Sequence, residues 1–228
     1  MRKIIFIAAT LLAFASNAFA NVNKPFISGI HFSEGFEIAR GEYSPDFGSF
    51  MGSRIYTALT YNAMIAITPN FVIHPAFGVH FRFCSHRDDD ETTVGTFVDD
   101  EGDVILVSED YENNYSLGLV LPLTARYYIT NYFFTEFGLE FNFNLFEKFN
   151  LGINVYDEAA EKIFEPKALN LGLTGGLGAT FDGFEISLKY THGLTDLYKE
   201  KTSYGIKFFN WSYSRINLNI GYWFGYKS

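Results

Sequence analysis

The sequence has almost none of the residues and motifs that mark a disulfide scaffold, a zinc site or a nucleotide enzyme. Cys84 is the single cysteine, so no disulfide can form within the chain. No cysteine stands at the end of the leader segment to carry a lipid. The chain also lacks a glycine-rich phosphate loop, a CxxC pair and an HExxH motif. We therefore expect no cofactor and no catalytic, cofactor-binding or metal site.

Long apolar runs and positive charge are scarce as well. Beyond the leader, no segment approaches the uninterrupted run of about 20 apolar residues that a spanning helix needs, which excludes a helical membrane protein. The chain has 17 Lys and Arg against 26 Asp and Glu, a formal charge of -9. Loss of Arg2 and Lys3 with the leader leaves 15 against 26, or -11. Such an acidic chain is unsuited to binding nucleic acid.

The first 20 residues predict a signal peptide. Arg2 and Lys3 precede the apolar run Ile4–Ala15, and the small-residue ending Ala18-Phe19-Ala20 fits an A-x-A cleavage site. We expect the mature chain to begin at Asn21. The predicted domain organisation is a signal peptide over residues 1–20 and one barrel domain over residues 21–228.

The rest of the sequence repeats one pattern, which is clearest in the stretch Phe184–Leu197. Its apolar side chains alternate with polar ones, the two-residue period of a strand with one apolar face. Asp182-Gly183 precedes it as a two-residue turn signal, so it predicts a hairpin with the stretch before it. Seven other stretches alternate in the same way: Ile27–Ala39, Arg54–Ile67, Phe71–Cys84, Tyr115–Tyr128, Tyr132–Leu145, Leu169–Phe181 and Trp211–Tyr226.

The connections between these strands alternate between tight turns and long polar loops. Together they predict an all-β, eight-stranded antiparallel up-and-down transmembrane β-barrel, with short periplasmic turns, long external loops and both termini in the periplasm. The polar face is rich in glycine and asparagine, whereas the charges concentrate in the loops, so we expect the apolar face to meet lipid. Aromatic residues flank the tight turns and are predicted to form a periplasmic girdle. They are Tyr127, Tyr128, Tyr132, Phe133, Phe181, Phe184, Tyr222, Trp223 and Tyr226.

At this point the chain resembles the small bacterial outer-membrane β-barrel proteins of the OmpA-barrel and PorT-like kind. The segments 188-LKYTHGLTDLY-198 and 216-INLNIGYWF-224 carry the resemblance, which extends over the whole mature chain. It implies a location in the outer membrane of a Gram-negative envelope. Barrels of this kind often end on an aromatic residue, whereas this chain continues past Phe224 to Tyr226-Lys227-Ser228.

Alternation predicts a group of ionisable side chains inside the barrel. An eight-stranded barrel is just wide enough for side chains to fill it, so we expect these groups to pair as a hydrogen-bonded plug. The alternative is a proton or ion path. In particular, Arg82 and Arg126 are expected to meet Glu136 and Glu140. The predicted lumen residues are His31, Glu37, His74, His80, Arg82, Arg126, Glu136, Glu140, Glu185 and Lys189.

The segment 85–114 is strongly acidic and predicts a long solvated hairpin with strands near Thr93–Val98 and Val104–Val107. Its carboxylates offer ligands for Ca²⁺, but their spacing does not match an EF-hand loop, so solvated charge is the preferred interpretation. A turn of helix is expected at Asp157–Lys162. The acidic residues are Asp88, Asp89, Asp90, Glu91, Asp99, Asp100, Glu101 and Asp103.

Three residues break the strand pattern. Glu34 falls on the apolar face and is placed at a rim or a bulge, where a charge costs least. Pro75 and Pro122 lie inside strands, which requires a bulge at each.

These observations favour a non-enzymatic outer-membrane protein with a closed polar lumen and acidic external loops in a structural or binding role. Expected partners are outer-membrane lipid and, through the loops, an extracellular or envelope protein, and the chain is expected to be a monomer. The first alternative is a narrow porin-like channel. The second is a lipid-modifying enzyme, with His192 and His86 near external strand ends and Ser85 and Glu147 as candidate partners.

Overall fold

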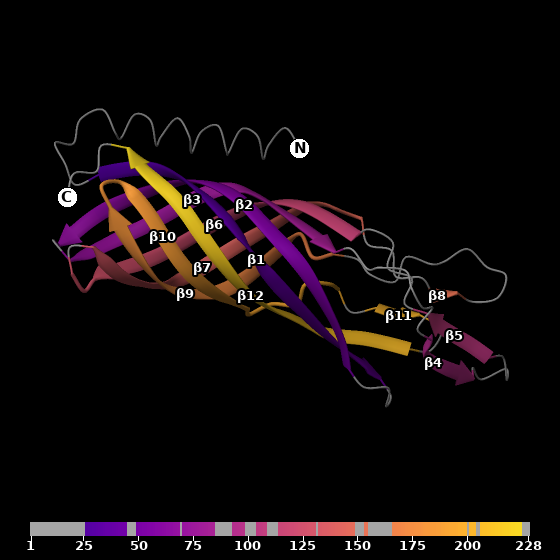
Figure 1. Cartoon of the computed structure of the whole chain (residues 1–228). Coiled ribbons are helices and arrows are strands. Elements are labelled where there is room, and N and C mark those ends of the chain that lie inside the picture. The colour runs from indigo at the N-terminus through magenta and orange to yellow at the C-terminus, as the bar shows by residue number, and fades with distance from the viewer. Residues whose placement is uncertain are drawn as a thin grey trace.

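The computed structural model is an elongated barrel whose wall is formed by tilted antiparallel strands (Figure 1). It describes residues 26–44, 49–68, 70–84, 93–98, 104–108, 114–130, 132–148, 153–154, 166–199, 201–203 and 206–224. The predicted signal peptide, the acidic residues of the 85–114 segment and the expected helical turn at 157–162 lie outside these residues. Within the described part of the chain, no helix is long and apolar enough to cross a membrane.

Eight strands form the barrel, each paired with its neighbours in sequence order, and pairing of β1 with β12 closes it. The described strands therefore confirm the predicted up-and-down topology. The barrel strands are β1 (Phe26–Ser44), β2 (Ser49–Thr68), β3 (Phe71–Cys84), β6 (Asn114–Tyr128), β7 (Phe133–Lys148), β9 (Leu169–Phe181), β10 (Phe184–Gly193) and β12 (Ile206–Phe224).

The strands are staggered around the barrel. The register, followed from Phe26 through all eight strands, returns to β1 at Phe36, ten residues further along. A closed barrel with such a stagger has strands tilted by about 35–45° from its axis. The tilt brings side chains of non-neighbouring strands together across the lumen.

The two ends of the barrel differ. At the turn end, short connections join β2 to β3, β6 to β7 and β9 to β10, and both ends of the described chain lie there (Figure 1). Asp182 (φ 47°) and Gly183 (φ 89°) both have positive φ, as the primed turn of an Asp-Gly hairpin requires. The other end, the loop end, carries the long connections.

Short strands lie in the connections of the loop end. β4 (Thr93–Val98) and β5 (Val104–Ser108) pair as the hairpin expected in the acidic segment. β8 (Ile153–Asn154), which the sequence did not predict, pairs with β5. β11 (Lys201–Ser203) folds back on β12.

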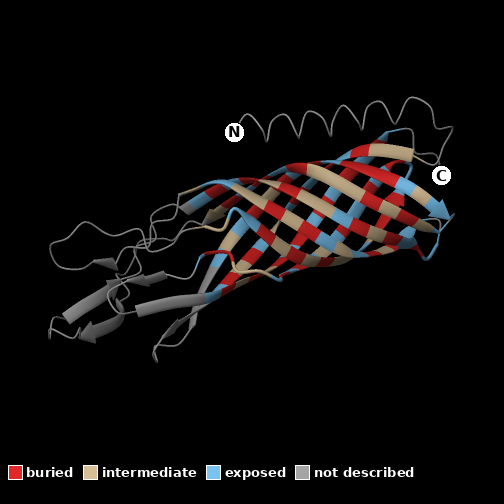
Figure 2. Cartoon of the chain, turned by 180° about the vertical axis from the view of Figure 1, so that it is seen from behind, coloured by how far each residue is buried: buried red, intermediate tan, exposed pale blue. Residues whose placement is uncertain are grey.

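Buried and exposed residues alternate along the barrel strands (Figure 2). On β10, Ile186 and Leu188 are half exposed, whereas Glu185 and Ser187 between them are buried. The apolar face therefore points outward and the polar face inward, as the sequence predicted. A soluble barrel has the opposite arrangement, because it buries its apolar side chains inside.

Two sequence-based placements along the strands are wrong. Glu34 lies at neither a rim nor a bulge. It pairs in regular register with Thr57 and Leu218, and the register of β1 with β12 shifts only between Arg40 and Glu42, where β12 carries the extra residue. The seventh strand ends at Gly193 and does not extend to Leu197.

The prolines do not mark bulges either. The register between β3 and β6 is the same on both sides of Pro75 and Pro122, with Pro75 opposite Leu123 and Gly78 opposite Val120. Proline has no N–H to donate, and the backbone hydrogen bonding between β3 and β6 is interrupted beside Pro75 and Pro122. The two prolines lie side by side, and the interruption is confined to the short stretch between Pro75 and Gly78.

The predicted aromatic girdle is correct for most of its members and wrong for two. Tyr128 and Trp223 are 9% and 0% exposed and point into the barrel, and Tyr226 lies outside the described residues. Local aromatic composition suggested a girdle position for Trp223, whereas its alternation with Asn217 and Asn219 places it inside. The outward members are Tyr127, Tyr132, Phe133, Phe181, Phe184 and Tyr222.

Candidate functional site

The lumen is the candidate site, because most of the described ionisable side chains of the strands gather there. All ten predicted lumen residues lie on the inner face. Nine of them are at most 5% exposed, and the Lys189 side chain is 13% exposed. Seven of them, all but the three histidines, belong to a turn-side cluster or a loop-side cluster, which neutral polar residues separate.

Arg126 is the centre of the turn-side cluster, which we define as Arg126, Glu136, Glu185 and Lys189. Its guanidinium donates to both oxygens of Glu185, from Nη1 at 2.7 Å and Nη2 at 3.0 Å. It also donates to Oε2 of Glu136, 3.0 Å from Nη2. Lys189 Nζ lies 2.6 Å from the other oxygen of Glu136. Two positive and two negative groups thus balance within the cluster.

Aromatic and imidazole rings surround this cluster. His74 contacts Glu136 through Nδ1 at 3.2 Å and the Asn62 amide oxygen through Nε2 at 3.1 Å. The Trp223 indole N–H donates to Glu185 Oε2 at 2.7 Å, and the Trp223 ring packs against His31 with centroids 4.6 Å apart. Each carboxylate is therefore held by more than one donor, as buried charges require.

The loop-side cluster, which we define as Glu37, Arg82, Glu140 and Arg215, has the same balance of charge. Arg82 Nε donates to Glu37 Oε2 at 3.1 Å and lies 3.0 Å from Oε1 of the same carboxylate. Arg215 Nη2 donates to Glu140 Oε1, and its Nη1 lies 3.6 Å from Glu37 Oε2. The Arg215 guanidinium also stacks on the Tyr56 ring, 3.7 Å from the centroid. The cluster joins β1, β3, β7 and β12 across the lumen.

The pairing within the clusters differs in part from the sequence-based expectation. Arg126 meets Glu136 as expected, but Arg82 pairs with Glu37 and meets neither Glu136 nor Glu140 in the described contacts. The sequence reasoning missed Arg215, the partner of Glu140. Arg215 lies two residues before Asn217 and four before Asn219, so the two-residue period of β12 places it on the same inner face.

His80 is the lumen residue least connected to the ion pairs. Its ring is 1% exposed and stacks on Tyr56, with centroids 5.7 Å apart. Among the described residues, neither ring nitrogen has a hydrogen-bond partner. His80 therefore fills space between the aromatic ring and Gly118 without joining the loop-side cluster.

An apolar plug closes the lumen at the turn end. We define it as Met64, Val72, Tyr128, Phe134 and Trp223, one residue from each of five strands, each at most 9% exposed. The Arg126 guanidinium lies over the Phe134 ring, 3.8 Å from its centroid. The plug and the turn-side cluster are thus one packed unit.

The chain that follows β10 packs against the inside of the barrel toward the loop end. Leu197 and Tyr198 are 3% and 1% exposed, and Tyr198 packs edge-on against Trp211 with centroids 5.3 Å apart. Arg54 Nη2 donates to the Tyr198 hydroxyl at 2.8 Å, which donates to Glu147 Oε1 at 2.5 Å. Burial raises the pKa of the Tyr198 phenol, and Arg54 opposes that shift.

Little open space remains between the two clusters. A cavity of about 20 Å³ lies among polar residues of the lumen, including Ser33, Thr60 and Asn217. That volume accommodates about one water molecule and excludes a sugar or an amino acid. Side chains therefore fill the described part of the lumen around this cavity.

The residues proposed for an enzyme site do not come together. His192 lies on the outer face, where its Nδ1 is 3.3 Å from Ser214 Oγ, and the Tyr190 hydroxyl donates to the same Oγ at 3.2 Å. The hydrogen bonds described for His192 reach no carboxylate, and Glu147 is held inside by Arg54 and Tyr198. Ser85 and His86 lie outside the described residues.

Over the part of the chain that the structure covers, no group of three His, Cys, Asp or Glu is arranged to hold a metal ion. The carboxylates considered for calcium, Asp88–Glu91 and Asp99–Asp103, lie outside it.

Comparison with known proteins agrees with the barrel. Residues 19–199, more than half of the chain, match the outer membrane protein beta-barrel domain family. No curated protein matches the chain in sequence. The chain is similar to the structure of Ail, the attachment invasion locus protein of Yersinia pestis, in complex with the heparin analogue sucrose octasulfate. The identity is 12%, over 86% of this chain and 99% of that one, with a TM-score of 0.42. It is also similar to Neisserial surface protein A, with 11% identity over 85% and 96% of the two chains and a TM-score of 0.43.

Proposed function

The chain belongs to the outer membrane protein beta-barrel domain family, and we propose that it is a non-enzymatic outer-membrane protein with a closed lumen. In this proposal the barrel is a rigid scaffold, and its acidic external loops contact an extracellular or envelope partner. The turn end and both termini lie in the periplasm. The barrel itself is a monomer in outer-membrane lipid.

The observation that carries this proposal is the filled lumen. Each of the two clusters contains two cations and two anions, so neither leaves a net charge to attract a permeating ion. The apolar plug closes one end, and Tyr198 with its partners closes the other. A channel needs a continuous polar path, which this arrangement does not offer.

Single-channel recording in planar bilayers tests the closed lumen. We expect no conductance steps from the purified wild-type protein. A variant with Arg126→Ala, Arg215→Ala, Trp223→Ala and Tyr198→Ala removes both central cations and both closures, and provides the matched open control. Steady steps from the wild-type protein at low voltage would favour the narrow channel instead.

The contact between His192 and Ser214 favours the lipid-modifying enzyme as a second candidate, because a serine near an imidazole on a lipid-facing wall is the beginning of a hydrolytic site. Against it, no carboxylate orients the imidazole in the described contacts. We expect lipid A and phospholipids from cells that express the protein to have the same mass spectra as those from cells that express Ser214→Ala. A deacylated product formed only by the wild-type protein would establish the enzyme.

The loop proposal has its own test. The protein is displayed on cells with the acidic residues 88–91 and 99–103 intact or replaced by Asn and Gln. Binding to a cationic protein such as lysozyme should weaken when the charges are removed. Equal binding by both forms would show that the acidic loop is not the contact. The same carboxylates could instead bind Ca²⁺. Calcium titration by calorimetry tests that alternative, and we expect no heat of calcium binding.

A further inference from the structure

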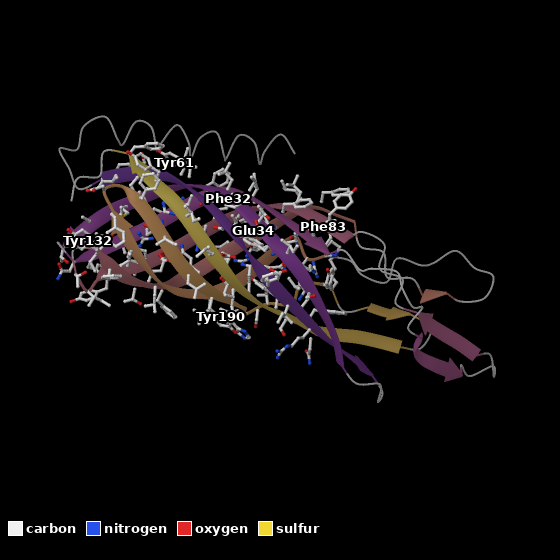
Figure 3. The ribbon with its side chains drawn as sticks, in the orientation of Figure 1. Phe32, Glu34, Tyr61, Phe83, Tyr132 and Tyr190 are labelled. Atoms are coloured by element: carbon white, nitrogen blue, oxygen red, sulfur yellow. The ribbon has the colours of Figure 1, made fainter. Side chains whose placement is uncertain are left out.

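Glu34 is an acidic side chain on the outer wall of the barrel. It lies in the middle of β1, is exposed, and is flanked on the same outward row by Phe32 and Phe36, which are 47% and 69% exposed. Figure 3 shows Glu34 between Tyr132, near the turn end, and Phe83, nearer the loop end. It therefore lies within the apolar belt that the outer-membrane location assigns to lipid.

The described residues give this carboxylate one hydrogen bond. Thr57 Oγ1 on β2 donates to Oε2 of Glu34 at 2.7 Å. The other neighbours on the outer wall are apolar, including Leu59 and Leu218 at 52% and 43% exposure. A carboxylate in hydrocarbon is costly unless a donor or a cation compensates it, and such residues in membranes mark functional contacts.

We propose that the outer wall around Glu34 and Thr57 is a docking surface for another outer-membrane protein, which presents a lysine or arginine side chain to Glu34 within the membrane. Thr57 holds one carboxylate oxygen in place, and the partner's cation binds the other. Phe32 and Phe36 supply apolar contact on either side. Burial of the ion pair between two barrel walls removes it from lipid and from water alike.

Charge complementarity favours a different protein over a second copy of this chain. Two copies insert in the same direction, so in a symmetric contact through β1 residues at the same height meet, and Glu34 would face another Glu34. On the described outer wall of β1, the positive side chain is Arg40, six residues nearer the loop end, where it cannot reach the height of Glu34 on a second copy. A phospholipid amine lies at the membrane surface rather than at the level of this carboxylate.

Photo-crosslinking in growing cells of the native organism tests the proposal. The probe is p-benzoylphenylalanine, placed at Phe36 beside Glu34 or, as a control, at Phe137 on β7, which is 60% exposed and lies across the barrel from β1. We expect a discrete protein adduct from position 36 and none from position 137. Glu34→Gln keeps the shape and an acceptor for Thr57 but removes the charge, and should reduce the adduct at least tenfold. Heat-dependent gel mobility checks that each variant is folded.

Mass spectrometry then identifies the partner and its crosslinked segment. The proposal requires a lysine or arginine in that segment, neutralisation of which removes the adduct. Combining Glu34→Lys with an acidic residue at the partner's position should restore it. An adduct unchanged by Glu34→Gln, an adduct with a second copy of this chain, or adducts with lipid alone would each overturn the proposal.

Discussion

Arg126 on β6 and Glu185 on β10 are joined by two hydrogen bonds, of 2.7 and 3.0 Å, across the lumen of the barrel. Their strands are not neighbours, since β7 and β9 lie between them in the wall. This bidentate geometry, in which Nη1 donates to Oε2 and Nη2 donates to Oε1, is among the strongest kinds of side-chain ion pair. It braces two parts of the wall that are separated by two strands.

Replacement of Arg126 by alanine should destabilise the barrel strongly. The change leaves Glu185 and Glu136 as buried carboxylates that lack their principal cation, which costs about 3–5 kcal/mol. Urea unfolding in detergent micelles, monitored by tryptophan fluorescence, measures the effect. Arg40→Ala, which removes an exposed cation of β1, is the control and should change stability by less than about 0.5 kcal/mol. Equal stability of the two variants would show that the pairing does not support the fold.

Two glycines of neighbouring strands should respond differently to a methyl group. A Cβ at Gly138 would lie 2.2 Å from the Leu123 carbonyl oxygen, a backbone atom that cannot move aside cheaply, whereas a Cβ at Gly175 meets its nearest atoms at 3.6 Å. We expect Gly138→Ala to destabilise the barrel by about 1–3 kcal/mol or to prevent its assembly. Gly175→Ala should have little effect. Refolding yield into detergent, read from heat-dependent gel mobility, compares the two.

The Asp-Gly turn provides a third prediction. Gly183 has a φ of 89°, a conformation that costs residues with a Cβ about 1–2 kcal/mol. Gly183→Ala should therefore lower the midpoint of urea unfolding, whereas Asp182→Asn should leave it unchanged because asparagine tolerates the left-handed region. An unchanged midpoint for Gly183→Ala would mean that the turn can adopt another type at no cost.

Tyr198→Phe tests the closure at the loop end. The variant keeps the ring that packs on Trp211 but removes the hydroxyl that joins Arg54 to Glu147. We expect a loss of about 1–2 kcal/mol, because Arg54 Nη2 and Glu147 Oε1 each lose their bond to the hydroxyl, whereas the direct bond from Arg54 Nη1 to Glu147 remains. We also expect faster cleavage by trypsin near Lys199. Tyr190→Phe removes an exposed hydroxyl that donates to Ser214 and should change neither quantity. Identical cleavage rates for wild type and Tyr198→Phe would contradict the role assigned to this residue.

Local composition misplaces two residues. The aromatic neighbours of Trp223 predict a girdle position, although its place in the alternation of β12 puts it inside with Asn217 and Asn219. The cost of a charge on the apolar face predicts a rim position for Glu34, yet the register keeps it in the middle of β1. In both cases the alternation was a better guide than the composition.

The sequence by itself determined the inside and the outside of this barrel. The two-residue period assigns each side chain to one face whatever its neighbours are, and the tight turns set which strands pair. This was enough to place Arg126, Glu136 and Glu185 in the lumen. Only the tertiary structure decided which charges meet, because the ten-residue stagger and the closure of the wall set the heights at which side chains face one another. Alternation carries no information about the distance from β6 to β10, so the bond between Arg126 and Glu185 exists only in the closed barrel.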